Sequence, residues 1–425
     1  MGFIEELKWR GMLHNMTEGV DEVLDEGPVC GYIGFDPTAP SLTIGNYVQI
    51  MILHFFQKAG HKPIVLMGGA TGRVGDPSGK DQERTLLSYE KLDANLAHQI
   101  TQFRRLLNFE EGKEAAIMVN NLDFYREMGV LDFLRDVGKS INVSYMLAKD
   151  SVKTRLDKGL SFTEFSYQLL QAYDFQCLYE KYNCTLQMGG SDQWGNITSG
   201  TEFIRRNLGK KAHAITTPLL TKSDGSKFGK SAEGNIWIDG SLTSPYKFYQ
   251  FWINADDADL PKYFRYFSFK EKQVIEALES EFADNPQELK KILAEELTRR
   301  IHGDESFEAV MHVSELMFNK KADRDFLSRL KSATWKALSH ELPTDEIERT
   351  AFIEGLDILD LLAEKTSIAS SKGDARRAIK GNAISINKVR IESFEHLVSV
   401  KDLMQDRYLL VENGKKNKYI VEVIS

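Results

Sequence analysis

Two segments of this sequence combine residue types that bind phosphate groups. Residues 34–46 (GFDPTAPSLTIGN) leave an apolar run, turn through two prolines and open a helical pattern. The N-terminus of a helix offers unpaired N–H groups and the positive end of the helix dipole, which suit a phosphate. Residues 227–231 (KFGKS) place two lysines three positions apart, where they could neutralise a triphosphate. Each segment alone also fits a plain explanation, an ordinary strand–turn–helix connection or a solvated surface loop.

A third segment, residues 68–80 (GGATGRVGDPSGK), is rich in glycine but matches neither common nucleotide-binding loop. Val74 and Asp81 stand where a P-loop requires Gly and Ser or Thr, and the glycines are spaced by threes rather than as Gly-x-Gly-x-x-Gly. A structural glycine turn is the alternative. Asp76 distinguishes the segment, because an acidic side chain in a loop after a strand could bind an ammonium group.

Residues 162–175 (FTEFSYQLLQAYDF) have a helical pattern that brings polar side chains onto one face. Tyr167, Gln171 and Asp174 are separated by four and then three residues, so they share that face. Tyr173 fits an ordinary aromatic residue of the core. Residues 187–196 (QMGGSDQWGN) follow a strand-like run and are polar and glycine-rich, as expected of a loop that binds a ribose.

Short β-rich runs alternate with helical stretches over the first 220 residues and would position these segments. Strands are predicted over residues 29–35, 63–69, 115–121 and 185–190, and helices over 44–59 and 89–107. This alternation predicts an α/β fold with a Rossmann-like, doubly wound and mostly parallel sheet. In such sheets ligands bind beyond the carboxyl ends of the strands, which is where the polar segments fall.

Composition divides the chain into domains. We predict the Rossmann-like domain over residues 1–240, an α-helical domain over 241–338, a polar, acidic linker over 339–350 and a small α+β domain over 351–425. The chain has 54 Lys and Arg against 62 Asp and Glu, a net charge of −8 that excludes a wholly basic nucleic-acid coat. Residues 361–425 nevertheless hold 12 basic and 8 acidic residues, so this end is expected to meet a polyanion.

The cysteines and the hydropathy indicate where the protein works. Cys30, Cys177 and Cys184 cannot all pair, and they form no Cys-x-x-Cys motif. No apolar run approaches the roughly 18 residues that a membrane span needs. We therefore expect a protein of a reducing compartment, the cytoplasm, with no membrane segment and no structural metal.

These segments together resemble known signatures, in order along the chain. Residues 34–46 resemble the HIGH signature of class I aminoacyl-tRNA synthetases, and residues 227–231 resemble their KMSKS loop. Four further segments are similar to the bacterial tyrosyl-tRNA synthetases in particular: residues 31–37, 68–79, 162–175 and 187–196. One departure is that Thr43 and Asn46 stand where the family usually has two histidines. Both can donate hydrogen bonds but neither can be cationic, so the lysines of the loop would supply the positive charge.

The resemblance implies a tyrosine–tRNA ligase. Such an enzyme activates L-tyrosine with ATP, which carries Mg²⁺, to tyrosyl-adenylate, and then transfers tyrosine to the 3′ end of tRNA(Tyr). No protein nucleophile is required, so catalysis would rest on positioning and charge stabilisation. The resemblance also implies a homodimer, and no tightly bound cofactor is expected.

The resemblance assigns residues to each part of the site. Tyr32 and Asp174 would meet the phenolic hydroxyl of tyrosine. Asp76, Tyr167 and Gln171 would meet its ammonium group, with Asn121 and Gln193 as further contacts. The groups that would act on the phosphates are Thr38, Thr43, Asn46, Lys227 and Lys230. The ATP and adenylate contacts would be Gly34, Asp36, Gly45, Gln187, Gly190, Asp192, Lys230 and Ser231.

Residues 370–388 resemble the small αL RNA-binding motif, which would make the C-terminal domain the one that binds tRNA. The basic residues expected to contact the RNA are Lys372, Arg376, Arg377, Lys380 and Lys388. The alternative is a solvated basic helix face. For the whole chain, two rivals remain: a tryptophan-specific enzyme of the same class, against which the aspartate at the pocket floor argues, and a non-catalytic RNA-binding paralogue, which would not need every predicted pocket residue and loop lysine.

Overall fold

The computed structural model describes residues 1–78, 86–110, 112–149, 152–153, 156, 159–231, 234–318, 322–414 and 417–424. Residues 79 and 80 of the third glycine-rich segment therefore lie outside the described residues. The chain divides into two compact units, one formed by residues 1–239 with 255–293 and the other by residues 240–254 with 294–425.

The first unit is built on a six-stranded sheet in the order β1-β6-β5-β2-β3-β4. Its strands are β1 (Asn15–Met16), β2 (Cys30–Phe35), β3 (Lys62–Met67), β4 (Ile117–Asn120), β5 (Cys184–Gly190) and β6 (His213–Thr217). Neighbouring strands from β6 to β4 pair in parallel, and β1 pairs antiparallel with β6. The four predicted strands and the doubly wound parallel sheet are confirmed, whereas β1 and β6 were not predicted.

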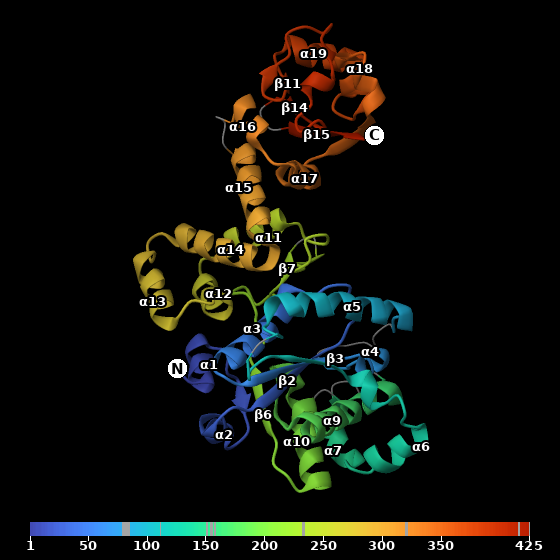
Figure 1. The fold of residues 1–425 in the computed structure, drawn as a ribbon, viewed down its shortest axis with the longest axis vertical. Helices are drawn as coiled ribbons and strands as arrows, with labels where there is room; N and C mark the ends of the chain where they lie inside the picture. The colour runs from blue at the N-terminus through green and yellow to red at the C-terminus, as the bar shows by residue number, and fades with distance from the viewer. Residues whose placement is uncertain are drawn as a thin grey trace. The chain divides into compact units, whose positions relative to one another are not determined.

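Helices cover both faces of this sheet. In Figure 1, α3 (Ile44–Lys58) and α5 (Tyr89–Leu106) lie on one side of it, and α9 (Phe162–Tyr182) and α10 (Trp194–Leu208) on the other. Tyr32 and Leu66 of the sheet pack with Phe175 and Ile204 of the second pair in one apolar core. The other helices of the unit are α1 (Phe3–Arg10), α2 (Val20–Glu26), α4 (Thr71–Val74), α6 (Val130–Asp132), α7 (Val143–Leu147), α12 (Leu260–Phe267) and α13 (Lys272–Glu281).

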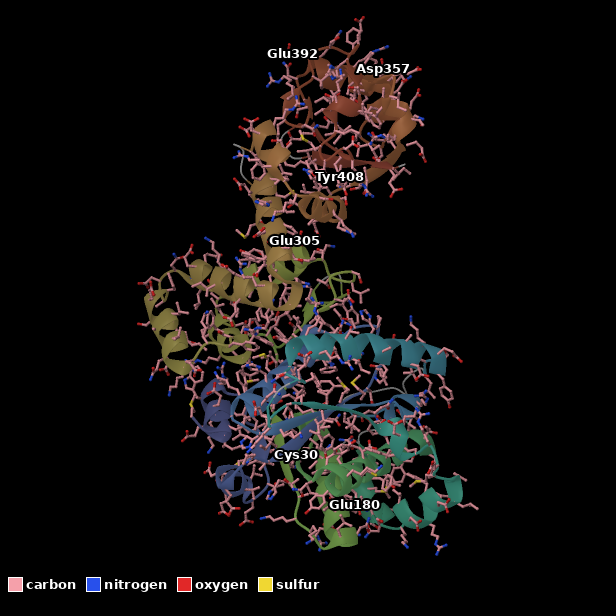
Figure 2. The ribbon with its side chains drawn as sticks, viewed as in Figure 1. Cys30, Glu180, Glu305, Asp357, Glu392 and Tyr408 are labelled. Carbon is pink, nitrogen blue, oxygen red and sulfur yellow. The ribbon has the colours of Figure 1, made fainter. Side chains whose placement is uncertain are left out.

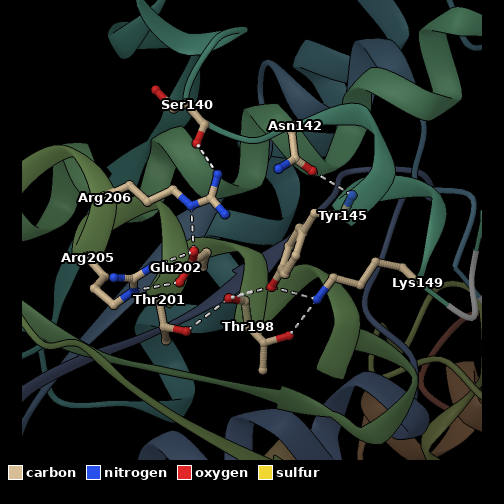
Figure 3. A network of polar contacts seen from close by, with 9 residues as sticks. All are labelled: Ser140, Asn142, Tyr145, Lys149, Thr198, Thr201, Glu202, Arg205 and Arg206. Carbon is tan, nitrogen blue, oxygen red and sulfur yellow. Dashed lines mark hydrogen bonds and ion pairs between the residues drawn. The ribbon is translucent and has the colours of Figure 1, made fainter.

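A polar network ties α10 to the segment around α7 (Figure 3). The Lys149 ammonium donates to the Tyr145 hydroxyl over 2.8 Å and to the Thr198 hydroxyl over 3.1 Å. On the next turn of α10, Glu202 accepts hydrogen bonds from Arg205 and Arg206. These contacts fix the helix that directly follows β5 and its polar loop.

The second unit contains a five-stranded sheet in the order β12-β11-β14-β15-β9. Its strands are β9 (Thr344–Glu348), β11 (Ile384–Ile386), β12 (Val389–Arg390), β14 (Tyr408–Asn413) and β15 (Asn417–Ile424), and β10 (Leu356–Asp357) pairs separately with β13 (Leu397–Val398). Its helices are α11 (Pro245–Ile253), α15 (Asp304–Phe318), α16 (Arg324–Arg329), α17 (Ser332–Glu341), α18 (Ile358–Asp360) and α19 (Lys372–Lys380), while α14 (Pro286–His302) begins in the first unit and ends in the second.

The predicted linker over residues 339–350 is not found. Helix α17 continues to Glu341, and β9 pairs in parallel with β15 from Thr344 opposite Ile420 to Glu348 opposite Ile424. The sequence of β9 is acidic and does not have the apolar pattern of a strand. This is because β9 lies at the edge of the sheet and buries only Ile347 among its five residues.

Helices and sheet of the second unit share an apolar cluster, which we call the helix–sheet core. Trp335 of α17 stacks on Tyr408 of β14, with ring centroids 5.6 Å apart (Tyr408 is labelled in Figure 2). Other members are Val313, Leu316, Leu327, Leu330, Leu338, Leu410 and Ile420. Residues 241–338 are therefore not a compact domain of their own: α12 and α13 belong to the first unit, and α11 and α15–α17 to the second.

Candidate active site

A cavity of about 370 Å³ opens at the carboxyl ends of β2, β3 and β5. Fifteen of the predicted site residues line it: Tyr32, Gly34, Asp36, Thr38, Gly45, Asn46, Asp76, Asn121, Tyr167, Gln171, Asp174, Gln187, Gly190, Asp192 and Gln193. Segments far apart in sequence meet here because parallel strands end at the same edge of the sheet. Thr43, Lys227, Lys230 and Ser231 lie outside the lining formed by the described residues, and the side chain of Ser231 is itself not described.

The floor of the cavity carries a buried carboxyl and a buried phenol. Asp174 and Tyr32 are each 1% exposed. Asp174 accepts a hydrogen bond from the Asn121 amide at 2.9 Å and from the Tyr125 hydroxyl at 2.7 Å. Burial raises the pKa of Asp174 to about 7, although these two hydrogen bonds act in the opposite direction. The Tyr32 hydroxyl has no hydrogen-bond partner among the described residues.

Three further carboxylates line the cavity. Asp36 accepts from the Tyr167 hydroxyl at 2.9 Å and from the Thr71 hydroxyl at 2.6 Å. Asp76 accepts from the Gln193 amide at 2.7 Å. Asp192 is exposed at the rim. An anionic wall of this kind suits an ammonium group, and Tyr167 and Gln171 approach it from the same face of α9, as predicted.

The N-terminus of α3 enters the cavity through Gly45 and Asn46, both exposed. Thr43 is the cap of this helix. Its hydroxyl accepts from the backbone N–H of Asn46 at 3.3 Å and lies 2.9 Å from the Asn46 side-chain oxygen. That oxygen also accepts from the backbone N–H of Thr43 at 3.0 Å. The two residues that stand in place of the family's histidines thus bond to each other and order the helix start.

The loop that carries the two lysines lies against this helix start. Gly229 has φ +82°, and a Cβ there would be 3.3 Å from the backbone nitrogen of Gly45. Phe228 is buried against Tyr263 and Phe267 of α12, with ring centroids 5.0 and 5.4 Å apart. The side chains of Lys227 and Lys230 are exposed.

A second anchor holds the N-terminal part of this loop. The buried Asp259, which precedes α12, accepts from the backbone N–H of Ser223 at 3.1 Å and from its hydroxyl at 3.3 Å. Sequence reasoning missed Asp259, because it lies 36 residues beyond its partner Ser223. It also missed Thr71 and Tyr125, and no spacing in the sequence links either of them to Asp36 or Asp174.

The predicted RNA-binding residues lie on and after α19. Lys372 pairs with Asp360 and Glu364, and Arg377 pairs with Asp374 over 3.1 Å. The Lys388 side chain is 15% exposed and lies 2.8 Å from Glu412. Arg376 and Lys380 are exposed and have no ion pair among the described residues. These two side chains are therefore the ones most open to an RNA phosphate.

Neither a metal centre nor a membrane-spanning helix is found among the described residues. No group of three or more His, Cys, Asp or Glu side chains among them could hold a metal ion. None of their helices combines the length and the apolar character that crossing a membrane requires.

Comparisons with known proteins agree along the whole chain. The model of the class I tRNA synthetases (W and Y) matches residues 24–319, and that of the tyrosine–tRNA ligase SYY-like C-terminal domain matches residues 336–421. The tyrosine–tRNA ligase of Cytophaga hutchinsonii is 52% identical over 423 residues, 99% of each chain, and that of Bacteroides fragilis is 48% identical over 428 residues, also 99% of each. A C-terminally truncated mitochondrial tyrosyl-tRNA synthetase of Aspergillus nidulans superposes with a TM-score of 0.67 at 31% identity, covering 75% of this chain and 94% of its own. This chain belongs to the class I tRNA synthetases and, among them, to the tyrosine–tRNA ligases.

Proposed function

We propose that this tyrosine–tRNA ligase binds tyrosine with its phenol on the cavity floor and its ammonium group on the anionic wall. The observation that carries the proposal is the floor, where a buried phenol without a partner among the described residues lies beside a buried carboxyl. The Tyr32 hydroxyl would donate a hydrogen bond to the phenolic oxygen of the substrate. The phenolic O–H of the substrate would in turn donate a hydrogen bond to Asp174. The ammonium group of tyrosine would be held by Asp76, Tyr167 and Gln171. Asn121 and Gln193 would make further contacts that orient the substrate.

Activation then needs a triphosphate near an acidic cavity. The tyrosine carboxylate would attack the α-phosphorus of ATP, the bond to pyrophosphate would break, and Mg²⁺ would enter with ATP as part of the substrate. None of the described residues that line the cavity is a lysine or an arginine. The N-terminus of α3 and the exposed Lys227 and Lys230 would therefore stabilise the charge that develops on the leaving pyrophosphate.

The adenylate would extend along the strand ends. Gly34 lies near the end of β2, and Asp36 and Thr38 follow this strand. Gln187, Gly190 and Asp192 belong to the end of β5 and the turn after it. Asp192, which is exposed and lines the cavity, would accept hydrogen bonds from ribose hydroxyls. Thr43 would support this region through the helix cap rather than by touching a phosphate.

Pyrophosphate exchange tests the assignment. Incorporation of labelled pyrophosphate into ATP, measured in parallel with tyrosine, tryptophan and phenylalanine, should respond to tyrosine far more strongly than to the other two. Preference for tryptophan would overturn the pocket assignment, and exchange with none of the three would favour the non-catalytic alternative.

For tRNA, we propose that Arg376 and Lys380 make the leading phosphate contacts of the C-terminal unit. Their exposure and lack of ion pairs among the described residues support this role. Lys372, Arg377 and Lys388 would have to exchange an existing carboxylate partner for a phosphate, which lowers their net gain.

A homodimer is supported by exposed apolar side chains on the first unit. Seven lie within residues 130–162, and five of them are at least 49% exposed: Val130, Leu131, Leu134, Val143 and Phe162. Monomeric proteins rarely leave a large apolar surface in water. Sedimentation velocity tests this: Leu131→Asp should shift the enzyme towards monomer, whereas Val274→Asp, at an exposed apolar position on α13, should not. A cytoplasmic location is supported by the three cysteines, all of which are free thiols.

A further inference from the structure

We propose that Tyr125 is a positioning residue for substrate recognition, which holds the Asp174 carboxyl in the orientation and charge state that accepts the phenolic proton of tyrosine. The proposal rests on the placement of the substrate phenol at Asp174 given above. Tyr125 is not among the residues that line the cavity, so it would act through Asp174 and not by touching tyrosine.

The first observation is the geometry around the Asp174 carboxyl. Its Oδ1 accepts from the Tyr125 hydroxyl at 2.7 Å, and its Oδ2 accepts from the Asn121 amide at 2.9 Å. Each carboxylate oxygen has two lone-pair positions, so one donor on each oxygen fixes the carboxyl plane and leaves acceptor capacity toward the cavity. Asn121 and Tyr125 are four residues apart around the short helix Asn121–Phe124, which follows the carboxyl end of β4.

The Tyr125 side chain is itself held in place. Its hydroxyl lies 3.0 Å from the Leu170 carbonyl oxygen, one turn before Asp174 on α9. Its ring packs against Tyr173 and Phe133, with centroids 5.8 and 6.4 Å away. The Tyr125 hydroxyl has only one proton to donate. It donates to Asp174 and not to the Leu170 carbonyl, because the carboxylate is closer and is the stronger acceptor. Removing this hydroxyl deletes a donor while the ring contacts remain.

The charge state of Asp174 depends on that donor. Burial favours the neutral acid, and so does the carboxylate of Asp36, whereas the hydrogen bonds from Asn121 and Tyr125 lower the pKa. The other titratable groups that interact with Asp174 are Tyr32, Tyr167, Tyr173 and Cys177, and burial raises the pKa of each of them, so they stay neutral near pH 7. A protonated Asp174 would offer its proton to the substrate hydroxyl instead of accepting one. Without the Tyr125 donor the acid form persists to higher pH.

The test compares Tyr125→Phe with Tyr173→Phe in the full-length enzyme. Tyr173 is the neighbouring tyrosine of α9, and its hydroxyl interacts with Cys177. Values of kcat/KM for tyrosine and for phenylalanine are measured by pyrophosphate exchange from pH 6 to pH 9. A hydrogen bond to a charged group is worth about one pKa unit or more. Raising the pKa of Asp174 by about one unit from about 7 lowers its ionised fraction at pH 7, so Tyr125→Phe should lower the ratio of kcat/KM for tyrosine over phenylalanine about fivefold. The pH at which tyrosine activation reaches half its maximum should rise by about one unit, and Tyr173→Phe should change neither quantity.

Three results would overturn the proposal. In Tyr125→Phe, the ratio of kcat/KM for tyrosine over phenylalanine and the pH dependence of tyrosine activation could match those of the wild type. Activation of both amino acids could fall equally, which would show that Tyr125 only maintains the fold. Tyr173→Phe could produce the same shift, which would show a general response to losing a phenol. Asp174→Asn separates this inference from the site assignment: if it leaves the ratio unchanged, the phenol binds elsewhere, whereas if it alters the ratio and Tyr125→Phe does not, only the role of Tyr125 fails.

Discussion

Replacing Tyr32 by phenylalanine should change protein stability and substrate recognition in opposite directions. The Tyr32 ring packs against Phe175, with centroids 5.2 Å apart, and phenylalanine keeps this contact. The hydroxyl is buried and has no hydrogen-bond partner among the described residues. An unsatisfied buried hydroxyl costs about 1–3 kcal/mol. We therefore expect the unliganded Tyr32→Phe protein to be more stable than the wild type by about 1 kcal/mol.

Recognition of tyrosine should weaken in the same variant. The proposed site uses the Tyr32 hydroxyl as a donor to the phenolic oxygen of the substrate, and phenylalanine makes no such contact. One neutral hydrogen bond is worth about 1 kcal/mol, which corresponds to about a fivefold lower ratio of kcat/KM for tyrosine over phenylalanine. Stabilisation by the same excess of tyrosine should shrink by about 1 kcal/mol, because a ligand in excess stabilises the folded state in proportion to the logarithm of its concentration over Kd.

Tyr266→Phe is the matched control. Tyr266 is also buried, but its hydroxyl donates to the Gly11 carbonyl at 2.7 Å. Its loss should destabilise the protein by about 1 kcal/mol and leave substrate selectivity unchanged. Urea unfolding of the free and tyrosine-bound proteins, together with pyrophosphate exchange, measures both quantities. If Tyr32→Phe destabilises the free protein as Tyr266→Phe does, the Tyr32 hydroxyl is bonded within the protein, and unchanged selectivity would remove it from the tyrosine site.

Three further predictions concern the loop, the C-terminal unit and the boundary between functions. Lys230→Ala should slow adenylate formation in a single-turnover assay while the Kd for tyrosine stays within about twofold, because the charge is needed mainly in the transition state; an unchanged rate would exclude the residue from the mechanism. Charge reversal at both Arg376 and Lys380 should weaken tRNA binding. The slope of log K for tRNA against log salt concentration should fall by the contribution of about two phosphate contacts, and an unchanged slope in the double variant would contradict this. A chain ending at Phe318 should keep pyrophosphate exchange and lose tRNA charging, because it keeps only Val313 and Leu316 of the helix–sheet core. A chain ending at Glu341 should aggregate, because α15, α16 and α17 all keep their apolar faces and lose the strands that cover them. A soluble monodisperse protein ending at Glu341 would refute the helix–sheet core.

The arrangement of the first unit could be predicted because local pattern and topology point the same way. Apolar runs bounded by Gly, Pro or Asn gave β2, β3, β4 and β5 to within two residues at either end. Once the strands are parallel, the loops after them must meet, so the place of the cavity followed from the order of elements. The individual residues of the site were assigned from the family resemblance. Thr43 was assigned to phosphate binding from its position in a signature, but its hydroxyl bonds to the helix start, as a residue in a capping position does.

The features that sequence reasoning missed depend on partners distant in the chain. Residues 344–348 form a strand because they pair with residues 420–424, and nothing in their own composition predicts it. In the sequence, Tyr125 is only a partly apolar residue after a turn. The fold brings its hydroxyl to the carboxyl of Asp174, 49 residues away. The role of Asp259 likewise cannot be predicted from the sequence, because it depends on the packing of α12 against the lysine loop. Such contacts carry no periodicity, so they require the tertiary structure.

The charge of the cavity explains why the lysines belong on a separate loop. Asp36, Asp76, Asp174 and Asp192 line the cavity, and its described lining includes no lysine or arginine. A lysine fixed inside would pair with these carboxylates in the absence of ATP and would compete with the ammonium group of tyrosine for them. Cations carried on the neighbouring loop avoid that competition, because Gly229 brings the loop against the start of α3 while the side chains of Lys227 and Lys230 stay in solvent. In the proposed site, tyrosine would then occupy the acidic wall, and the lysines would add positive charge where the phosphates of ATP would lie.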